Sequence, residues 1–373
     1  MHTDADVAPS GLRRALAVGL VGLVLAAALV ASVIDGADPS AGRGRTPFVT
    51  TFAGERNQIE AVLVSGDGQA FAAIAQDPLL TRPELVPGHG ELAYRAQRPV
   101  WGHLAWAVSF GRPDLVGWAL AGLTVVAAGG CVTVLALLLL QRGRSPWWAL
   151  AVIAAGIESI SQLTPELFAL ALVGLAVWRA RERRGWAIAL CCAAALTRET
   201  MLVAVAAWAL HELVCTSGAW RSRLRAVAPF TVPFVAFGGW VVVLRARTGT
   251  WPWEQQHDRA SAPFAGLFDA FDPVSGRITV GVSVVVILCA LCLWLARADV
   301  LSWMALAYAV FATTFAAQVW TGAGYERTLL PLYAFGGIAA LGGLAQRARR
   351  HDDGASSGSS TYTEAPSFVT SGR

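Results

Sequence analysis

The chain has 373 residues, of which 55% are hydrophobic and only 14% are charged. Soluble domains usually carry about 25% charged residues, so the composition argues against a soluble protein and indicates a polytopic membrane protein. The formal net charge of +4 is too small to favour nucleic-acid binding, and no nucleic acid is expected as a partner. Arginine supplies every basic side chain except histidine, a usage that suggests a GC-rich bacterial genome.

The N-terminus carries Arg13 and Arg14 just before an apolar run that ends near residue 34. A signal peptide is one interpretation. However, the run is about 20 residues long and has no convincing cleavage site, so we interpret it as an uncleaved first span.

Ten apolar runs are long enough to cross, or half cross, a bilayer. They lie near residues 14–34, 114–140, 146–160, 165–178, 185–197, 199–215, 226–244, 278–296, 301–319 and 328–346. Several are shorter than the roughly 20 residues that a full span needs. The stretches 146–178 and 185–215 can therefore each be one long helix or two short ones.

Arginine clusters favour two helices in each stretch. Clusters lie at Arg142 and Arg144, at Arg179–Arg184 and at Arg221–Arg225. A single span between successive clusters would place them on opposite sides of the membrane, against the positive-inside rule. Pro165 supports a break near residues 161–164. We therefore predict an all-α protein of about ten transmembrane helices in the bacterial inner membrane, with both termini cytoplasmic.

One membrane domain is expected over residues 1–350, with a disordered, Ser/Gly-rich cytoplasmic tail over residues 351–373. Two long outer segments cover residues 35–113 and 245–277. The first is expected to carry short interfacial helices near residues 55–64 and 69–76. In the second, Phe264, Leu267, Phe268 and Phe271 follow the spacing of a helix that lies in the membrane interface.

Charged residues gather on the predicted outer side. Arg198 and Glu199 lie between Ala-rich helices, where a charge is costly unless it is paired or hydrated. Each can belong to a solvated turn, or Arg198 can bind a lipid phosphate through its fork of donors. Arg327, just before the last span, has the same two interpretations. The full outer set is Asp67, Glu166, Arg198, Glu199, Glu326 and Arg327.

Asp67 lies between two glycines in the stretch SGDGQAF, residues 65–71. Such a sequence is typical of a surface turn, but the carboxylate can also be a catalytic base at the membrane face. Tyr94, Arg95 and Arg98 precede the second span as headgroup anchors or as a second phosphate clamp. The histidines are too scattered for a metal site.

Several short motifs together resemble a known family. They are DGQAF (67–71) followed by AQDPL (75–79), YRAQR (94–98), LTRE (196–199) and RTLLP (327–331). In this order they are similar to motifs of the GT-C glycosyltransferases, which use polyprenyl-phosphate sugars at the outer membrane face. The resemblance covers residues 1–346 and implies a GT-C-like membrane fold.

The resemblance implies an inverting sugar transfer from a polyprenyl-phosphate donor to an envelope glycan or lipid acceptor. Asp67 is then the general base, and Arg198 and Arg327 stabilise the leaving phosphate. The implied substrate-binding residues are Gln69, Tyr94, Arg95, Arg98, Glu166, Arg198, Glu199 and Arg327. The first outer segment has no paired acidic motif, so a divalent metal is unsupported and no cofactor is expected.

The sequence departs from the family pattern at four positions. Ala70 and Ala72 replace aromatic residues, Glu166 stands in place of Asp, and His103 replaces Pro. Two other functions therefore stay open. A transporter or flippase of a lipid-linked sugar would use the same arginines without a base, and a non-catalytic membrane scaffold would tolerate the loss of Asp67.

Overall fold

The computed structural model describes residues 9–38, 57–82, 92–180, 182–255, 260–271, 277–295, 299–321 and 324–357. Helices dominate these ranges, and the only β-type pairing within them is an isolated bridge between Ala260 and Phe315. The predicted all-α class is therefore confirmed.

The helices follow one another with short connections. In chain order they are α1 (Pro9–Asp35), α2 (Gln58–Ser65), α3 (Gly68–Gln76), α4 (Leu92–Ala96), α5 (Pro99–Val108), α6 (Pro113–Gln141), η3 (Pro146–Leu150), α7 (Ala151–Ala155), α8 (Ile157–Ser161), α9 (Glu166–Arg179), α10 (Arg184–Thr197), α11 (Met201–Cys215), α12 (Trp220–Val227), η4 (Ala228–Phe230), α13 (Thr231–Thr248), η5 (Pro252–Gln255), α14 (Ala265–Ala270), α15 (Arg277–Leu295), α16 (Val300–Ala312), α17 (Ala317–Thr321) and α18 (Gly324–Ser357).

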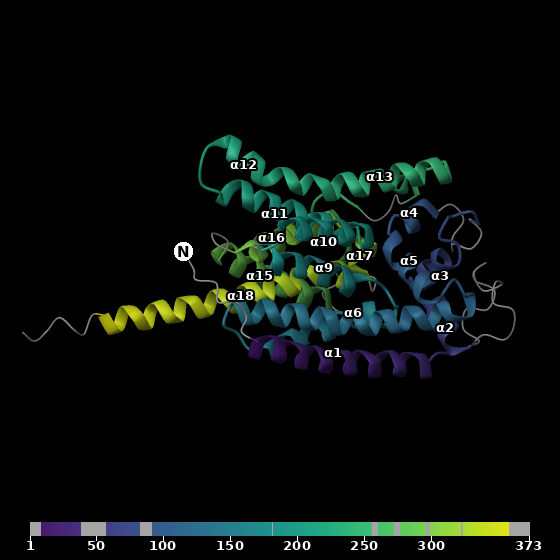
Figure 1. Ribbon diagram of the computed structural model, residues 1–373, viewed down its shortest axis with the longest axis horizontal. Helices are drawn as coiled ribbons and strands as arrows, with labels where there is room; N and C mark the ends of the chain where they lie inside the picture. The colour runs from purple at the N-terminus through teal and green to yellow at the C-terminus, as the bar shows by residue number, and fades with distance from the viewer. Residues whose placement is uncertain are drawn as a thin grey trace, which may run out of the picture.

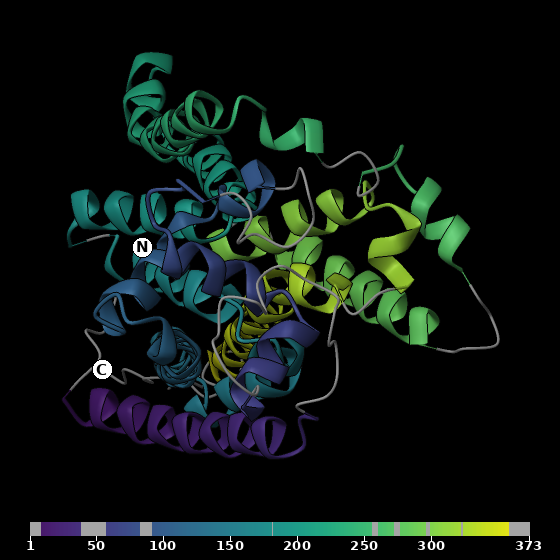
Figure 2. The ribbon, with the colours of Figure 1, turned by 90° about the vertical axis from the view of Figure 1, so that its right-hand side faces the viewer.

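The long helices lie side by side in one bundle (Figure 1). The short helices α2 to α5 gather at one end, which we call the site end. At the other end, called here the arginine-rich end, lie α12 and the projecting C-terminal part of α18 (Figure 1). Figure 2 looks at the site end and shows α1 and α13 at opposite edges of the bundle.

Three stretches are long and apolar enough to cross a membrane: Pro9–Asp35, Pro113–Gln141 and Trp220–Thr248. The second is central, with 67% of its most apolar window buried, whereas the first and third are only 28% and 22% buried. Their large apolar side chains point outward, as at Leu20 (62% exposed) and Val235 (71% exposed). Apolar faces of this size suit contact with lipid. Membrane character is thus supported, while the ten-span topology stays a prediction.

Both ambiguous stretches are broken where two short helices were predicted. Residues 162–165 separate α8 from α9, and residues 198–200 separate α10 from α11. Leu163 takes a left-handed conformation with φ of 55°, which turns the chain, and Pro165 then precedes α9. Arg198 is extended, with φ of −150° and ψ of 113°, so the α10 helix ends before it.

The short helices α2 and α3 form in the segment predicted to be the first outer one, but they do not lie on a surface. Asn57 and Glu60 close a capping box at the start of α2, which satisfies backbone N–H groups there. Seven residues of α3 are buried, because α3 packs against α5 and α6. The expectation of interfacial helices is therefore wrong for α3, which is enclosed by protein. Residues 39–56 lie outside the described part of the chain.

Two further sequence expectations concern the second half of the chain. The helix expected near residues 264–271 is the short helix α14, which exposes Phe268 (75%) and is flanked by Phe264 and Phe271, each 50% exposed. Helix α18 contains Pro331 and continues to Ser357, past the boundary expected at residue 350. Residues 358–373 of the predicted tail lie outside the described ranges.

The ten-span topology predicts that the two ends of the bundle face opposite sides of the membrane. In a variant whose six cysteines are replaced by alanine, Asp114→Cys at the site end should react with an impermeant maleimide in intact cells. Ser217→Cys, in the exposed connection between α11 and α12, should react only after permeabilisation. Equal labelling of both positions in intact cells would contradict this topology.

Candidate functional site

The turn that carries Asp67 packs closely against the loop between α8 and α9. A Cβ atom on Gly68 would lie 2.6 Å from the carbonyl oxygen of Gln162, and one on Gly66 would lie 3.0 Å from the Gln162 Cγ. The Asp67 backbone N–H also donates to Gln162 Oε1, at 3.4 Å. The two glycines therefore permit an approach that side chains would block, and this approach fixes the position of Asp67.

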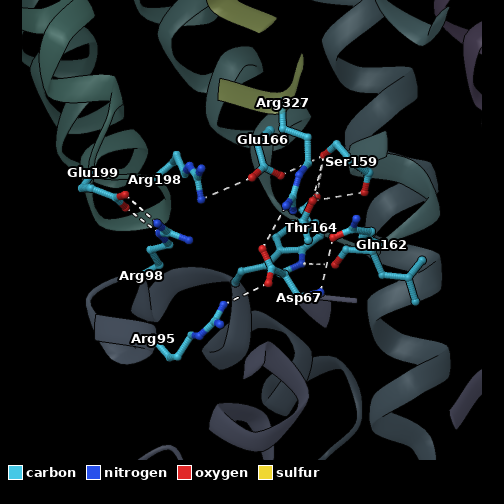
Figure 3. Close-up of polar contacts among 12 residues, drawn as sticks. Asp67, Arg95, Arg98, Ser159, Gln162, Thr164, Glu166, Arg198, Glu199 and Arg327 are labelled. Atoms are coloured by element: carbon cyan, nitrogen blue, oxygen red, sulfur yellow. Dashed lines mark hydrogen bonds and ion pairs between the residues drawn. The ribbon is translucent and has the colours of Figure 1, made fainter. Parts of the chain in front are cut away.

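Asp67 is held by two arginines that come from distant parts of the chain (Figure 3). Arg95 Nη1 lies 2.9 Å from Asp67 Oδ1, and Arg327 Nη2 lies 3.0 Å from Asp67 Oδ2. The side chains are largely enclosed, with exposures of 27% for Asp67, 16% for Arg95 and 9% for Arg327. Each carboxylate oxygen thus accepts a charge-assisted hydrogen bond.

The electrostatics of Asp67 follow from this pairing. Burial raises the pKa of the carboxyl, but the positive charges of Arg327, Arg95 and Arg98 outweigh that effect and hold the pKa well below its usual range. Asp67 is therefore ionised at neutral pH. It is also a weak base for as long as both arginines remain bound to it.

A second ion pair ties the start of α5 to the α10–α11 break. Arg98 Nε and Nη2 each lie 2.6 Å from one carboxylate oxygen of Glu199, and Arg98 Nη2 also donates to Tyr94 Oη at 3.2 Å. Burial raises the pKa of Glu199, but Arg98 and Arg198 lower it to about 2. Tyr308 Oη holds the same break by donating to the Thr200 carbonyl at 2.8 Å.

A third pair is looser and lies between the other two (Figure 3). Arg198 Nη1 is 3.4 Å from Glu166 Oε1, while Glu166 Oε2 accepts a hydrogen bond of 2.9 Å from Ser159. Within the described part of the chain, three buried atoms of this region have no hydrogen-bond partner: Arg198 Nε, Arg327 Nε and Glu166 Oε1. Arg198 and Arg327 therefore keep donors that a bound anion can use.

The structure brings together most of the residues predicted for the site. The cluster contains Asp67, Tyr94, Arg95, Arg98, Glu166, Arg198, Glu199 and Arg327. Gln69 lies in the first turn of α3, and its Oε1 is buried with no hydrogen-bond partner among the described residues. The side chain of Glu326 lies outside the described set.

Sequence reasoning missed the α8–α9 loop as part of the site. The hydroxyls of Ser159 and Thr164 hydrogen-bond to each other; Ser159 also donates to Glu166, and Thr164 also donates to the Ser159 carbonyl. The Gln162 side chain donates to Glu158 and accepts from the backbone N–H of Asp67. The only signal was the short polar run SQLT at residues 161–164, between two apolar runs. Such a run predicts a turn but does not show what the turn contacts.

Charges in the cluster balance one another. Its four arginines are Arg95, Arg98, Arg198 and Arg327. They are matched by Asp67, Glu166 and Glu199 within the cluster and by Glu158, which accepts a hydrogen bond from Gln162 beside it. In the described ranges, no three His, Cys, Asp or Glu side chains are placed to hold a metal ion. The cluster can bind anions through its arginines or accept a proton at a carboxylate.

The fold and this cluster define a class: a helical, membrane-type protein with a buried arginine–carboxylate site at one end of its bundle. Comparisons of the chain with protein-family models, with curated proteins and with solved structures give no match.

Replacing Gly68 by alanine should displace the Asp67 turn, because the new Cβ meets a backbone oxygen that has no freedom to rotate away. We expect a loss of about 1–3 kcal/mol in the free energy of unfolding, as for other overpacked sites. Thermal unfolding in detergent measures it. Gly122→Ala is the matched control, because no atom lies within 4 Å of its added Cβ. Equal midpoints for both variants would contradict this packing.

Glu199→Gln should destabilise the fold by about 3 kcal/mol, since it leaves Arg98 buried without its counter-charge. The pKa of Glu199 is lowered from 4.5 to about 2, so the pair stabilises the folded state fully above pH 4.5. That contribution disappears as the pH falls toward 2.

Urea unfolding of wild type and Glu199→Gln at pH 7 and pH 3 tests this, and the difference between them should shrink at pH 3. Asp114→Asn is the control, because the Arg112–Asp114 pair is exposed and its loss should leave stability unchanged. A Glu199→Gln effect no larger than that of the control would refute a stabilising pair.

Proposed function

We propose that this protein is a membrane glycosyltransferase of the GT-C type. It would move a sugar from a polyprenyl-phosphate donor to a hydroxyl of an envelope glycan or lipid acceptor. The observation that carries the proposal is the Asp67 carboxylate held between Arg95 and Arg327, next to Arg198 with unused donors. The motifs around the same residues, which resemble those of GT-C enzymes, support the same conclusion.

The proposed reaction uses Asp67 as the general base. The carboxylate takes the proton of the acceptor hydroxyl, whose oxygen forms a bond to the anomeric carbon of the sugar. The bond between that carbon and the phosphate oxygen breaks, and its electron pair leaves with the lipid phosphate. Attack from the side opposite the phosphate inverts the anomeric configuration. Arg198 and Arg327 stabilise the charge that grows on the phosphate.

Donor binding must change the pairing of Asp67 for this reaction to proceed. A phosphate that binds Arg198 and Arg327 competes with Asp67 for the Arg327 guanidinium. The Asp67 carboxylate then loses part of its positive surroundings, and its pKa rises. Asp67 would thus become an effective base only when the donor is bound, which protects the enzyme from unproductive proton transfer.

The bundle has features that support an extracytoplasmic active site. The cluster lies at the site end, whereas Arg183, Arg184, Arg221 and Arg225 are exposed at the other end. Basic residues near membrane spans favour the cytoplasmic side. The site would then face the outside of the bacterial inner membrane, where lipid-linked sugars meet envelope acceptors.

A transporter or flippase of a lipid-linked sugar is the second candidate. The specific observation in its favour is that Arg95 and Arg327 bind both oxygens of Asp67, which lowers the pKa of Asp67 and makes the resting carboxylate a poor base. A transporter needs the arginines to bind the phosphate but needs no proton transfer.

A transfer assay separates the two candidates. Membranes with wild-type protein, Asp67→Asn or the exposed control Asp114→Asn are supplied with radiolabelled polyprenyl-phosphate sugars. We expect Asp67→Asn to lower the transfer rate by at least about a hundredfold, the usual contribution of a general base. Asp114→Asn should transfer at the wild-type rate, because its side chain is exposed and pairs only with Arg112 among the described residues.

The other outcomes are equally informative. An unchanged transfer rate in Asp67→Asn would show that Asp67 is not the general base. If a folded wild-type protein transferred sugar from no donor but moved labelled lipid across proteoliposomes, the flippase would replace the enzyme. Whichever activity the wild type shows, transfer or transport, its loss in Arg327→Gln would identify Arg327 as the phosphate-binding side chain.

A further inference from the structure

The arginine-rich end of the bundle carries positive charge that the protein does not neutralise. Around α9, α10 and α12 at this end, the described arginines are Arg179, Arg183, Arg184, Arg221, Arg223 and Arg225, and the nearby acidic residues are Glu182 and Glu212. Glu182 pairs with Arg179, and Glu212 accepts from the Trp208 indole. This excess contrasts with the arginine–carboxylate cluster at the site end, where four carboxylates match four arginines.

Two chain segments form this surface together. Arg184, at the start of α10, donates to the Ala226 carbonyl in α12, so the two basic segments lie next to each other. The Arg184 guanidinium also lies 5.8 Å from the centre of the Phe230 ring. A pocket between α10, α11 and η4 opens here, with Arg184, Trp208 and Phe230 among its lining side chains.

Exposed tryptophans mark the same surface. Trp186 is 63% exposed at the start of α10, and Trp220 is 60% exposed at the start of α12. Tryptophan is enriched where a membrane meets water, because its ring is amphipathic. Beyond Trp220 the apolar outer face of α13 begins, with Val235 71% exposed and Val242 58% exposed. An apolar flank that continues from a basic surface suits a ligand with an anionic head and apolar chains.

From this combination we infer that the surface formed by Arg184, Arg221, Arg225, Trp186 and Trp220 binds the headgroups of anionic phospholipids. The arginines bind the phosphates, the tryptophan rings lie at headgroup depth, and the acyl chains run along α13. A nucleic acid or an acidic protein would satisfy the arginines but would leave the apolar flank uncovered. The inference does not depend on the proposed transferase activity.

Native mass spectrometry of the full chain measures the binding. Protein is released from nanodiscs of phosphatidylcholine with or without phosphatidylglycerol, and the retained lipid is counted. The test variant Arg221→Gln/Arg225→Gln removes two exposed arginines from this surface. The control Arg112→Gln/Arg247→Gln removes two exposed arginines at the site end. Wild type should retain phosphatidylglycerol in preference to phosphatidylcholine.

We expect phosphatidylglycerol retention to fall about fivefold for each arginine removed from the surface, and not to change in the control. Arg221→Lys/Arg225→Lys should recover most of it, because the charge is kept. Size-exclusion profiles and thermal midpoints confirm that each variant is folded. Equal loss in test and control variants, no loss in either, or full displacement of the lipid by inorganic phosphate would each overturn the inference.

Discussion

The ion pairs of Asp67 are the interaction on which the site and much of the fold depend. A carboxylate enclosed by an apolar bundle is stable only if positive charge and hydrogen bonds replace its water. Arg95 and Arg327 supply both, from positions 28 and 260 residues away. The same contact therefore joins the α2–α3 turn to α4 and to α18. Any change that moves Asp67 also disturbs the packing of the α2–α3 turn against α4 and α18.

The other arginines differ in how fully the protein uses them. Arg98 is bound by both oxygens of Glu199 and by Tyr94, which favours a positioning role over direct substrate contact. It fixes the α10–α11 break, and this in turn places Arg198 beside Glu166. Arg198 and Arg327 keep unused donors. We therefore propose that Arg98 fixes the position of the α10–α11 break, while Arg198 and Arg327 contact the ligand.

Sequence patterns predicted the helices well and the contacts of the site poorly, for a physical reason. Apolar runs and arginine clusters are local signals. They predicted one break near residues 161–164 and another between the runs 185–197 and 199–215, and the structure has these breaks at residues 162–165 and 198–200. The ion-pair partners of Asp67 depend on which distant helices pack next to one another, and no local sequence pattern encodes that arrangement. Ser159 and Thr164 were missed because the sequence around a hydroxyl in an apolar stretch is the same whether the side chain only packs in a helix or hydrogen-bonds to a site residue. The burial of α3 was missed because its small residues resemble an exposed amphipathic turn.

Charge balance adds a reason why the proposed base is Asp67. The cluster is neutral at rest, so a phosphate diester that enters it brings one uncompensated negative charge. Breaking the sugar–phosphate bond adds a second negative charge to the leaving phosphate. If Asp67 accepts the acceptor proton in the same step, it loses its own charge and releases Arg95 from its ion pair, while Arg327 already binds the phosphate. Positive charge then becomes available beside the phosphate as its second negative charge develops. If a base out of reach of these arginines took the proton, its protonation would free no positive charge for the phosphate.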